Sequence, residues 1–152
     1  MFIKKILTIS FFSLLVFGGA TRAQAQEIAP EKGIYDVTLA DLNAEGPLTA
    51  RDIDVYLKYL YLTRGHEARK NPEATSDPEG RKILEFAKDN GLSIVRLRYI
   101  LEKVPFGSMV AVKPDPESAP TPPVPYLKLS TEEIKVLTDN LNRILEAYEA
   151  LK

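Results

Sequence analysis

The sequence contains no cysteine and a single histidine, His66. Without cysteine the chain forms no disulfide, and it has no thiolate for catalysis or for metal binding. A conventional Ser-His-Asp nucleophile would have to be built around His66. His66 and Glu67 would begin the helical zinc motif His-Glu-x-x-His, but Lys70 occupies the second histidine position. We therefore predict no metal site, no cofactor and no catalytic residue.

Other catalytic motifs are also missing. The sequence has no Gly-x-Gly-x-x-Gly pattern, no phosphate-binding loop and no calcium loop. Ser93 lacks the closing glycine of a nucleophile elbow, and helix capping explains it. Carboxylates such as Asp52, Asp54 and Glu67 remain open as an acid/base pair, although their spacing does not single them out. These absences favour a non-enzymatic protein.

Long hydrophobic runs are missing too, because the apolar run at residues 6–17 is shorter than the roughly 20 residues of a membrane span. This run follows a basic start and precedes the small-x-small site at residues 23–25, a pattern typical of a secretory signal peptide. Residues 1–25 contain three of the 20 basic residues. Removing them leaves 127 residues with 17 basic and 21 acidic side chains, a net charge of −4. We predict a cleaved, periplasmic or secreted protein without a stable membrane span.

The mature chain opens with residues 26–48, whose apolar pattern fits neither a strand nor a sustained helix. We expect an extended N-terminal lead-in, with at most one short turn of helix. Thr49 and Asp52 then form a capping pattern that predicts a first helix to about Arg69. Two apolar stripes cover most of its circumference, and a helix with so wide an apolar face is normally central, between two neighbours.

Two more helices are expected before residue 112. The Ser76 region supplies a cap and a following proline for the second helix, which runs to about Asn90. Gly91 suits the left-handed residue after a helix. Ser93 can then cap a third helix, which Pro105 and Gly107 are expected to end. Residues 108–112 form a short apolar segment that is predicted to be a strand or extended cover.

The end of the chain combines a linker with a helix. Residues 113–126 are rich in proline, which favours polyproline II over regular hydrogen-bonded structure. Ser130 and Glu133 form a capping box at the start of a helix within residues 127–152. We therefore predict an all-α fold, a small bundle of about four helices. In this fold a three-helix unit at 49–112 packs together, and the C-terminal helix packs on that unit after the Pro-rich linker.

The segment from Ala87 to Leu97 resembles the helix-turn-helix family of DNA-binding motifs. Ala87, Gly91 and Leu97 stand where that family has a small residue, the turn glycine and an apolar residue. The resemblance implies a groove-reading helix in which Arg96 and Arg98 would contact DNA. Export and net acidity oppose this interpretation, because phosphate contacts supply most of the affinity for DNA. We predict no nucleic-acid partner, and a nucleic-acid binder is the alternative if the signal peptide is misread.

A partner-binding surface is the leading functional hypothesis. Val95 and Tyr99 lie away from the apolar stripe of the third helix, and Arg96 and Lys103 flank them. Exposed aromatic and arginine side chains are typical of contact hot spots. Tyr59 on the first helix is a candidate partner-binding residue for the same reason. We predict an adaptor of the cell envelope that binds a protein or peptide, while the alternative is that neighbouring segments cover these side chains.

Two further possibilities stay open. One is a small-molecule binder or hydrolase with a pocket at the first helix, for which Tyr56, Tyr59 and His66 are candidate walls. The other concerns the last helix, which carries apolar residues at alternating spacings of three and four from Ile134 to Leu151. That seam is predicted to pack on its own chain or, as an alternative, to form a homodimer through the C-terminal helix.

Overall fold

The computed structural model describes residues 32–77, 80–113 and 120–152. The predicted signal peptide, residues 1–25, lies outside the described residues. Within the described part the regular elements are all helical, which confirms the all-α fold class. In chain order they are η1 (Ile34–Asp36), α1 (Leu39–Asn43), α2 (Ala50–Arg64), α3 (His66–Lys70), α4 (Pro72–Thr75), α5 (Arg81–Asp89), α6 (Ile94–Val112), η3 (Pro125–Leu127) and α7 (Thr131–Ala150).

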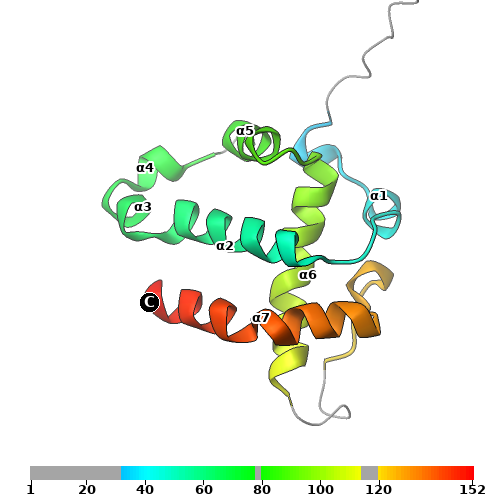
Figure 1. Cartoon of the computed structure of the whole chain (residues 1–152). Coiled ribbons are helices and arrows are strands. Elements are labelled where there is room, and N and C mark those ends of the chain that lie inside the picture. The colour runs from blue at the N-terminus through cyan, green and yellow to red at the C-terminus, as the bar shows by residue number, and fades with distance from the viewer. Residues whose placement is uncertain (1–31, 78–79, 114–119) are drawn as a thin grey trace, which may run out of the picture. The chain divides into compact units, whose positions relative to one another are not determined.

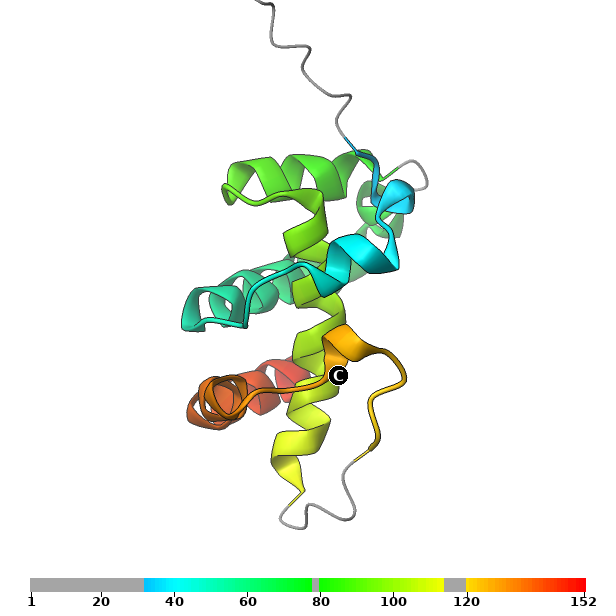
Figure 2. The same cartoon turned by 90° about the vertical axis from the view of Figure 1, so that its right-hand side faces the viewer.

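Helix α6 is the centre of the bundle. Helices α2 and α7 lie side by side and both cross α6, while α5 packs near its N-terminal end (Figures 1 and 2). Three helices therefore pack together and α7 joins them after the proline-rich segment, as the sequence predicted. The largest fully buried side chains come from α2, α6 and α7: Ile53, Leu97, Ile100, Val104, Leu137 and Ile144.

The predicted starts of α2 and α7 are confirmed, whereas the predicted cap of the second helix near Ser76 is wrong: α5 begins at Arg81, after Gly80, which makes no side-chain cap hydrogen bond. The Thr49 hydroxyl accepts a hydrogen bond from the Asp52 amide, and Ser130 does the same for Glu133. The predicted end of the first helix is wrong. Gly65 has extended backbone angles, so α2 stops at Arg64 and the short helices α3 and α4 follow. The segment at 71–77 thus contains the helical turn α4.

Helix α6 continues through Pro105, so the expected strand or extended cover at residues 108–112 is wrong. A proline inside a helix loses one backbone hydrogen bond and costs about 3 kcal/mol. Burial offsets this cost, because Val104, Gly107 and Ser108 are all buried. A methyl group on Gly107 would overlap Cδ1 of Leu137, so glycine allows α6 and α7 to approach closely here.

The lead-in before α2 is more structured than an extended segment. It holds the 3₁₀ turn η1 and the short helix α1, which Thr38 caps by accepting a hydrogen bond from the Asp41 amide. Val37, Leu42 and Leu48 are buried in the core. This segment therefore contributes to packing, which local periodicity did not reveal.

Residues 114–119 of the predicted linker lie outside the described residues, and Pro120 to Val124 precede the turn η3. Among the described helices, none is both long enough and apolar enough to cross a membrane.

Candidate functional site

The predicted partner-binding residues Tyr99 and Lys103 are buried, with 2% and 4% of their surface exposed. Lys103 Nζ donates a hydrogen bond to the Tyr99 hydroxyl at 2.6 Å and lies 2.7 Å from Glu133 Oε1. The Tyr99 hydroxyl donates to the same carboxylate oxygen at 3.1 Å. Segments of this chain therefore cover Tyr99 and Lys103, which was the alternative weighed for this face. We call Tyr99, Lys103 and Glu133 the buried cluster.

The electrostatics of the buried cluster favour its ionised form. Burial alone would raise the pKa of Glu133. Hydrogen bonds from Lys103 and from the backbone amides of Ser130 and Leu48 instead hold that pKa below its usual value. Burial is also the main reason that the pKa of Tyr99 is raised, with the Glu133 charge as the second cause. The protonated Tyr99 hydroxyl can donate to Glu133 while it accepts from Lys103, so it links the two charged side chains.

Arg96 acts inside the chain as a clamp. Its guanidinium lies 2.6 Å from Asp52 Oδ2 and donates hydrogen bonds to the carbonyl oxygens of Gly46 and Pro47 at 2.7 and 2.8 Å. It also pairs with Glu45 at 3.3 Å. Although burial opposes it, hydrogen bonding to Asp52 raises the Arg96 pKa. These contacts fix the loop before α2 onto α6.

Val95 and Tyr59 are the remaining two predicted partner residues. Both are partly buried and pack against the core. The ring of Tyr59, on α2, meets Phe86 of α5 edge to face at a centroid distance of 5.3 Å. The five predicted residues therefore do not form one face, and of the five Tyr59 alone lines one of the hollows described below.

That hollow is part of a groove between α2 and α5. The groove consists of three adjoining hollows of about 380, 370 and 480 Å³, and Asp89 lines all three. Phe86 lines the first and second hollows, and Lys58 lines the second and third. Lys58 Nζ lies 2.9 Å from Asn90 Oδ1 and 5.9 Å from the Phe86 ring centroid. The three hollows together form what we call the α2–α5 groove. Its lining residues are Arg51, Asp54, Lys58, Tyr59, Leu62 and Thr63 from α2 and Lys82, Glu85, Phe86, Asp89 and Asn90 from the α5 side.

Two of the three residues predicted to wall a small-molecule pocket lie elsewhere. Tyr56 is buried, and its hydroxyl lies 2.6 Å from that of Tyr148 on α7. Burial is the first cause of its raised pKa. His66 is exposed at the start of α3. Of the three, Tyr59 alone lines one of the hollows described here.

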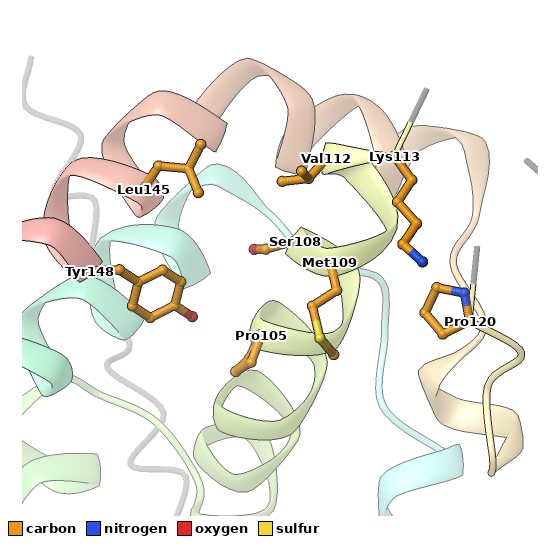
Figure 3. A pocket seen from close by; sticks show the side chains of 8 residues that line it. All are labelled: Pro105, Ser108, Met109, Val112, Lys113, Pro120, Leu145 and Tyr148. Atoms are coloured by element: carbon orange, nitrogen blue, oxygen red, sulfur yellow. The ribbon is translucent and has the colours of Figure 1, made fainter. Parts of the chain in front are cut away.

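A second, more apolar hollow of about 660 Å³ lies between α6 and α7 (Figure 3). The α6 side carries Pro105, Ser108, Met109 and Val112, at positions i, i+3, i+4 and i+7 of one helix face. The sequence did not predict this stripe, because the helix was expected to end at Pro105. The signal was present in the spacing of the apolar residues. From α7 come Leu145 and Tyr148.

The segment that resembles a helix-turn-helix forms the corner between α5 and α6. Gly91 has a φ of 65°, and the Leu92 amide donates to the Ala87 carbonyl at 2.9 Å. The arginines expected to read DNA have partners in the fold. Arg98 donates to the Val37 carbonyl at 3.0 Å and to Glu102 at 2.8 Å, and Arg96 forms the clamp described above. The corner packs two helices and uses both arginines internally.

Among the described residues, no group of three or more histidine or acidic side chains is placed to hold a metal ion. Comparison of the chain with protein-family models, with curated proteins and with solved structures finds no match. The fold places the chain in the class of small helical bundles. The candidate sites are argued from the geometry of this chain alone.

Proposed function

We propose that this chain is an exported, non-enzymatic binding protein of the cell envelope that recognises a protein or peptide partner. The α2–α5 groove is the binding surface. The observation that carries this proposal is the exposed Leu62, which is 58% accessible beside the Tyr59 and Phe86 rings. Apolar and aromatic groups with a charged rim are typical of protein interfaces.

The groove supports recognition for a second reason. Its floor is rigid, since Phe86 is buried and in contact with Tyr59, while Leu62 projects toward solvent. Its rim alternates in charge, with Lys58 on α2 and with Glu85 and Asp89 on α5. A rigid apolar floor lowers the entropy lost on binding, and a mixed rim selects a partner with matching charges.

Site-specific photocrosslinking tests the groove. A photoreactive amino acid at Leu62 should capture a defined envelope protein or peptide, which mass spectrometry identifies. Leu39, on α1, is the matched control because it is also about half exposed, at 49% against 58%. Leu62→Asp and Glu85→Lys should each reduce capture from a second photoreactive position, Thr63, and leave the melting temperature unchanged. Equal capture from the Leu39 position, or equal capture by the variants, would refute the groove as the binding surface.

Export is tested separately. Fractionation should place the protein in the envelope or medium, with Gln26 as its N-terminal residue. Recovery in the cytoplasm with Met1 retained would contradict the export part of the proposal and leave the groove test unaffected.

A small-molecule binder or hydrolase with a pocket at α2 is the second candidate function. It is favoured by the hollow of about 380 Å³ beside Tyr59, because ligand pockets commonly measure about 300–1,000 Å³. Asp77 and Glu85 place two carboxylates on its lining. A thermal-shift screen should then find a ligand that stabilises the wild type and fails to stabilise Leu62→Asp. A screen without such a ligand would reject this candidate.

A further inference from the structure

Several large apolar side chains are exposed on α6 and α7. Met109 and Val112 on α6 are 56% and 51% exposed, and Ile134 and Leu145 on α7 are 42% and 41% exposed. Met109, Val112 and Leu145 surround the hollow of about 660 Å³ (Figure 3). Large exposed apolar patches on a small protein mark interaction sites. We call Met109, Val112, Ile134, Leu141 and Leu145 the α6–α7 patch.

The exposed side of α7 has the spacing of a helix-pairing seam. Ile134, Thr138, Leu141, Leu145 and Tyr148 follow one another at intervals of four, three, four and three residues. Such alternation keeps side chains on one face and is the spacing by which helices pair side by side. A different face of α7 packs against its own chain, through the fully buried Leu137 and Ile144. Helix α7 thus carries a core face and a second seam, which is exposed at Ile134 and Leu145 and partly buried at Tyr148.

We propose that the α6–α7 patch is the interface of a homodimer in which the α7 helices of two copies pair antiparallel. This inference goes beyond the proposed function and uses a different surface. A second copy is favoured over another partner because the charges beside the seam are complementary to themselves under a two-fold axis. Isologous interfaces need this self-complementarity.

The charges in question are those of Lys135 and Glu149. Each follows a seam residue directly, Ile134 and Tyr148 respectively, so both lie on the same flank of the seam. Antiparallel pairing about an axis near Asn142 places Lys135 of one copy beside Glu149 of the second copy, twice. Parallel pairing would instead place this flank beside the opposite flank of the second copy and would not bring Lys135 to Glu149. The opposite flank carries Leu137 and Ile144, which α7's own chain covers.

The ion pairs that Lys135 and Glu149 form within their own chain do not oppose pairing with a second copy. Lys135 pairs with Asp139 at 2.6 Å and Glu149 pairs with Lys152, and all four side chains are at least 55% exposed. Exposed pairs within one helix contribute little, so they can rearrange when a second copy binds. Helix α6 extends past α7 (Figures 1 and 2), which places Met109 and Val112 beside the seam and enlarges the apolar area that the second copy would bury.

Sedimentation velocity across a range of concentrations tests the proposal on the protein as it is recovered from the cell. The wild type should sediment as a dimer. Leu145→Asp and Met109→Asp should each weaken dimerisation at least about 30-fold, the effect of losing one interface hot spot. Leu39→Asp, at a similarly exposed position on α1, should leave the dimer intact. Circular dichroism and the melting temperature check that each variant is folded.

Charge reversal tests the antiparallel arrangement. Lys135→Glu alone and Glu149→Lys alone should each weaken the homodimer, because each creates two like-charge contacts. Mixing the two variants should restore a dimer, since one copy then offers two acidic side chains and the other two basic ones. A purely structural defect would not be rescued by mixing.

Three results would overturn the proposal. The first is a wild type that stays monomeric at every concentration. This result would overturn the proposal even if an apolar ligand or another protein were found in the hollow. The second is a dimer that Leu145→Asp leaves unchanged, and the third is a mixture that shows no recovery. Leu62→Asp should leave the dimer intact, so a failure of the partner-binding proposal is distinguishable from a failure of this one.

Discussion

Lys103 Nζ of α6 lies 2.7 Å from Glu133 Oε1 of α7, and both side chains are at most 5% exposed. The Glu133 carboxylate also accepts hydrogen bonds from the Leu48 amide at 2.9 Å and from the Ser130 amide at 2.8 Å. One carboxylate therefore joins the segment before α2, the central helix and the start of α7. The negative charge of Glu133 is balanced by the Lys103 ammonium beside it.

Replacing Lys103 with methionine should destabilise the fold by about 3 kcal/mol, because it leaves Glu133 charged and buried without its cation. The double variant Lys103→Met with Glu133→Gln should recover much of that loss. The glutamine carries no charge and its carbonyl oxygen can still accept from the Leu48 amide, although its NH2 group then replaces the oxygen that accepts from the Ser130 amide. Urea denaturation measures both values. A double variant less stable than Lys103→Met would contradict this account of the cluster.

Acid should destabilise the fold through the same carboxylate. The Glu133 pKa is lower in the folded state than in the unfolded chain, so folding favours the ionised form. Its contribution is present above the unfolded pKa, about 4.5, and is lost as the pH falls through the lower folded value. Asp41, whose pKa falls to about 2 mainly through Lys32, acts in the same direction.

Below pH 5, the free energy of unfolding should therefore decrease more steeply with falling pH for the wild type than for Glu133→Gln. The glutamine variant has no carboxylate to protonate at this position, and its carbonyl oxygen can still accept from the Leu48 amide. Parallel curves for the two proteins would show that Glu133 does not govern the acid transition.

Gly107→Ala should cost about 1–3 kcal/mol, because the added methyl group would overlap Cδ1 of the fully buried Leu137. Gly46→Ala is the matched control, since a Cβ at Gly46 meets no atom within 4 Å. The control should change stability by less than about 0.5 kcal/mol. Thermal and urea unfolding compare the two. Equal effects would mean that the close approach of α6 and α7 does not depend on Gly107.

Arg96→Lys should destabilise the fold by about 1–2 kcal/mol, although it keeps the positive charge. Lysine lacks the planar fork that reaches Asp52 and the carbonyl oxygens of Gly46 and Pro47 together. Arg51→Lys is the control, because Arg51 is exposed and donates to the Asn90 carbonyl alone at 2.9 Å. Equal stability of Arg96→Lys and the wild type would rule out the clamp.

Sequence reasoning succeeded where the physics is local. Thr49, Ser93 and Ser130 each accept a hydrogen bond from an amide three residues ahead, so a few neighbouring residues specify where a helix begins. It failed at Pro105, where a local rule ends the helix and burial against α7 continues it. It also treated Tyr99 as an exposed contact, because local spacing does not tell which segment will cover a side chain.

The all-α class and the starts of α2, α6 and α7 follow from the sequence by itself, because each capping pattern depends on residues within a few positions of one another. The tertiary structure decided which polar groups are interior and which apolar groups remain outside. Glu133 meets Tyr99 across 34 residues and the Leu48 amide across 85, and contacts at such separations form only when the chain folds. The same folding buries Leu137 and leaves Leu145 half exposed on one helix.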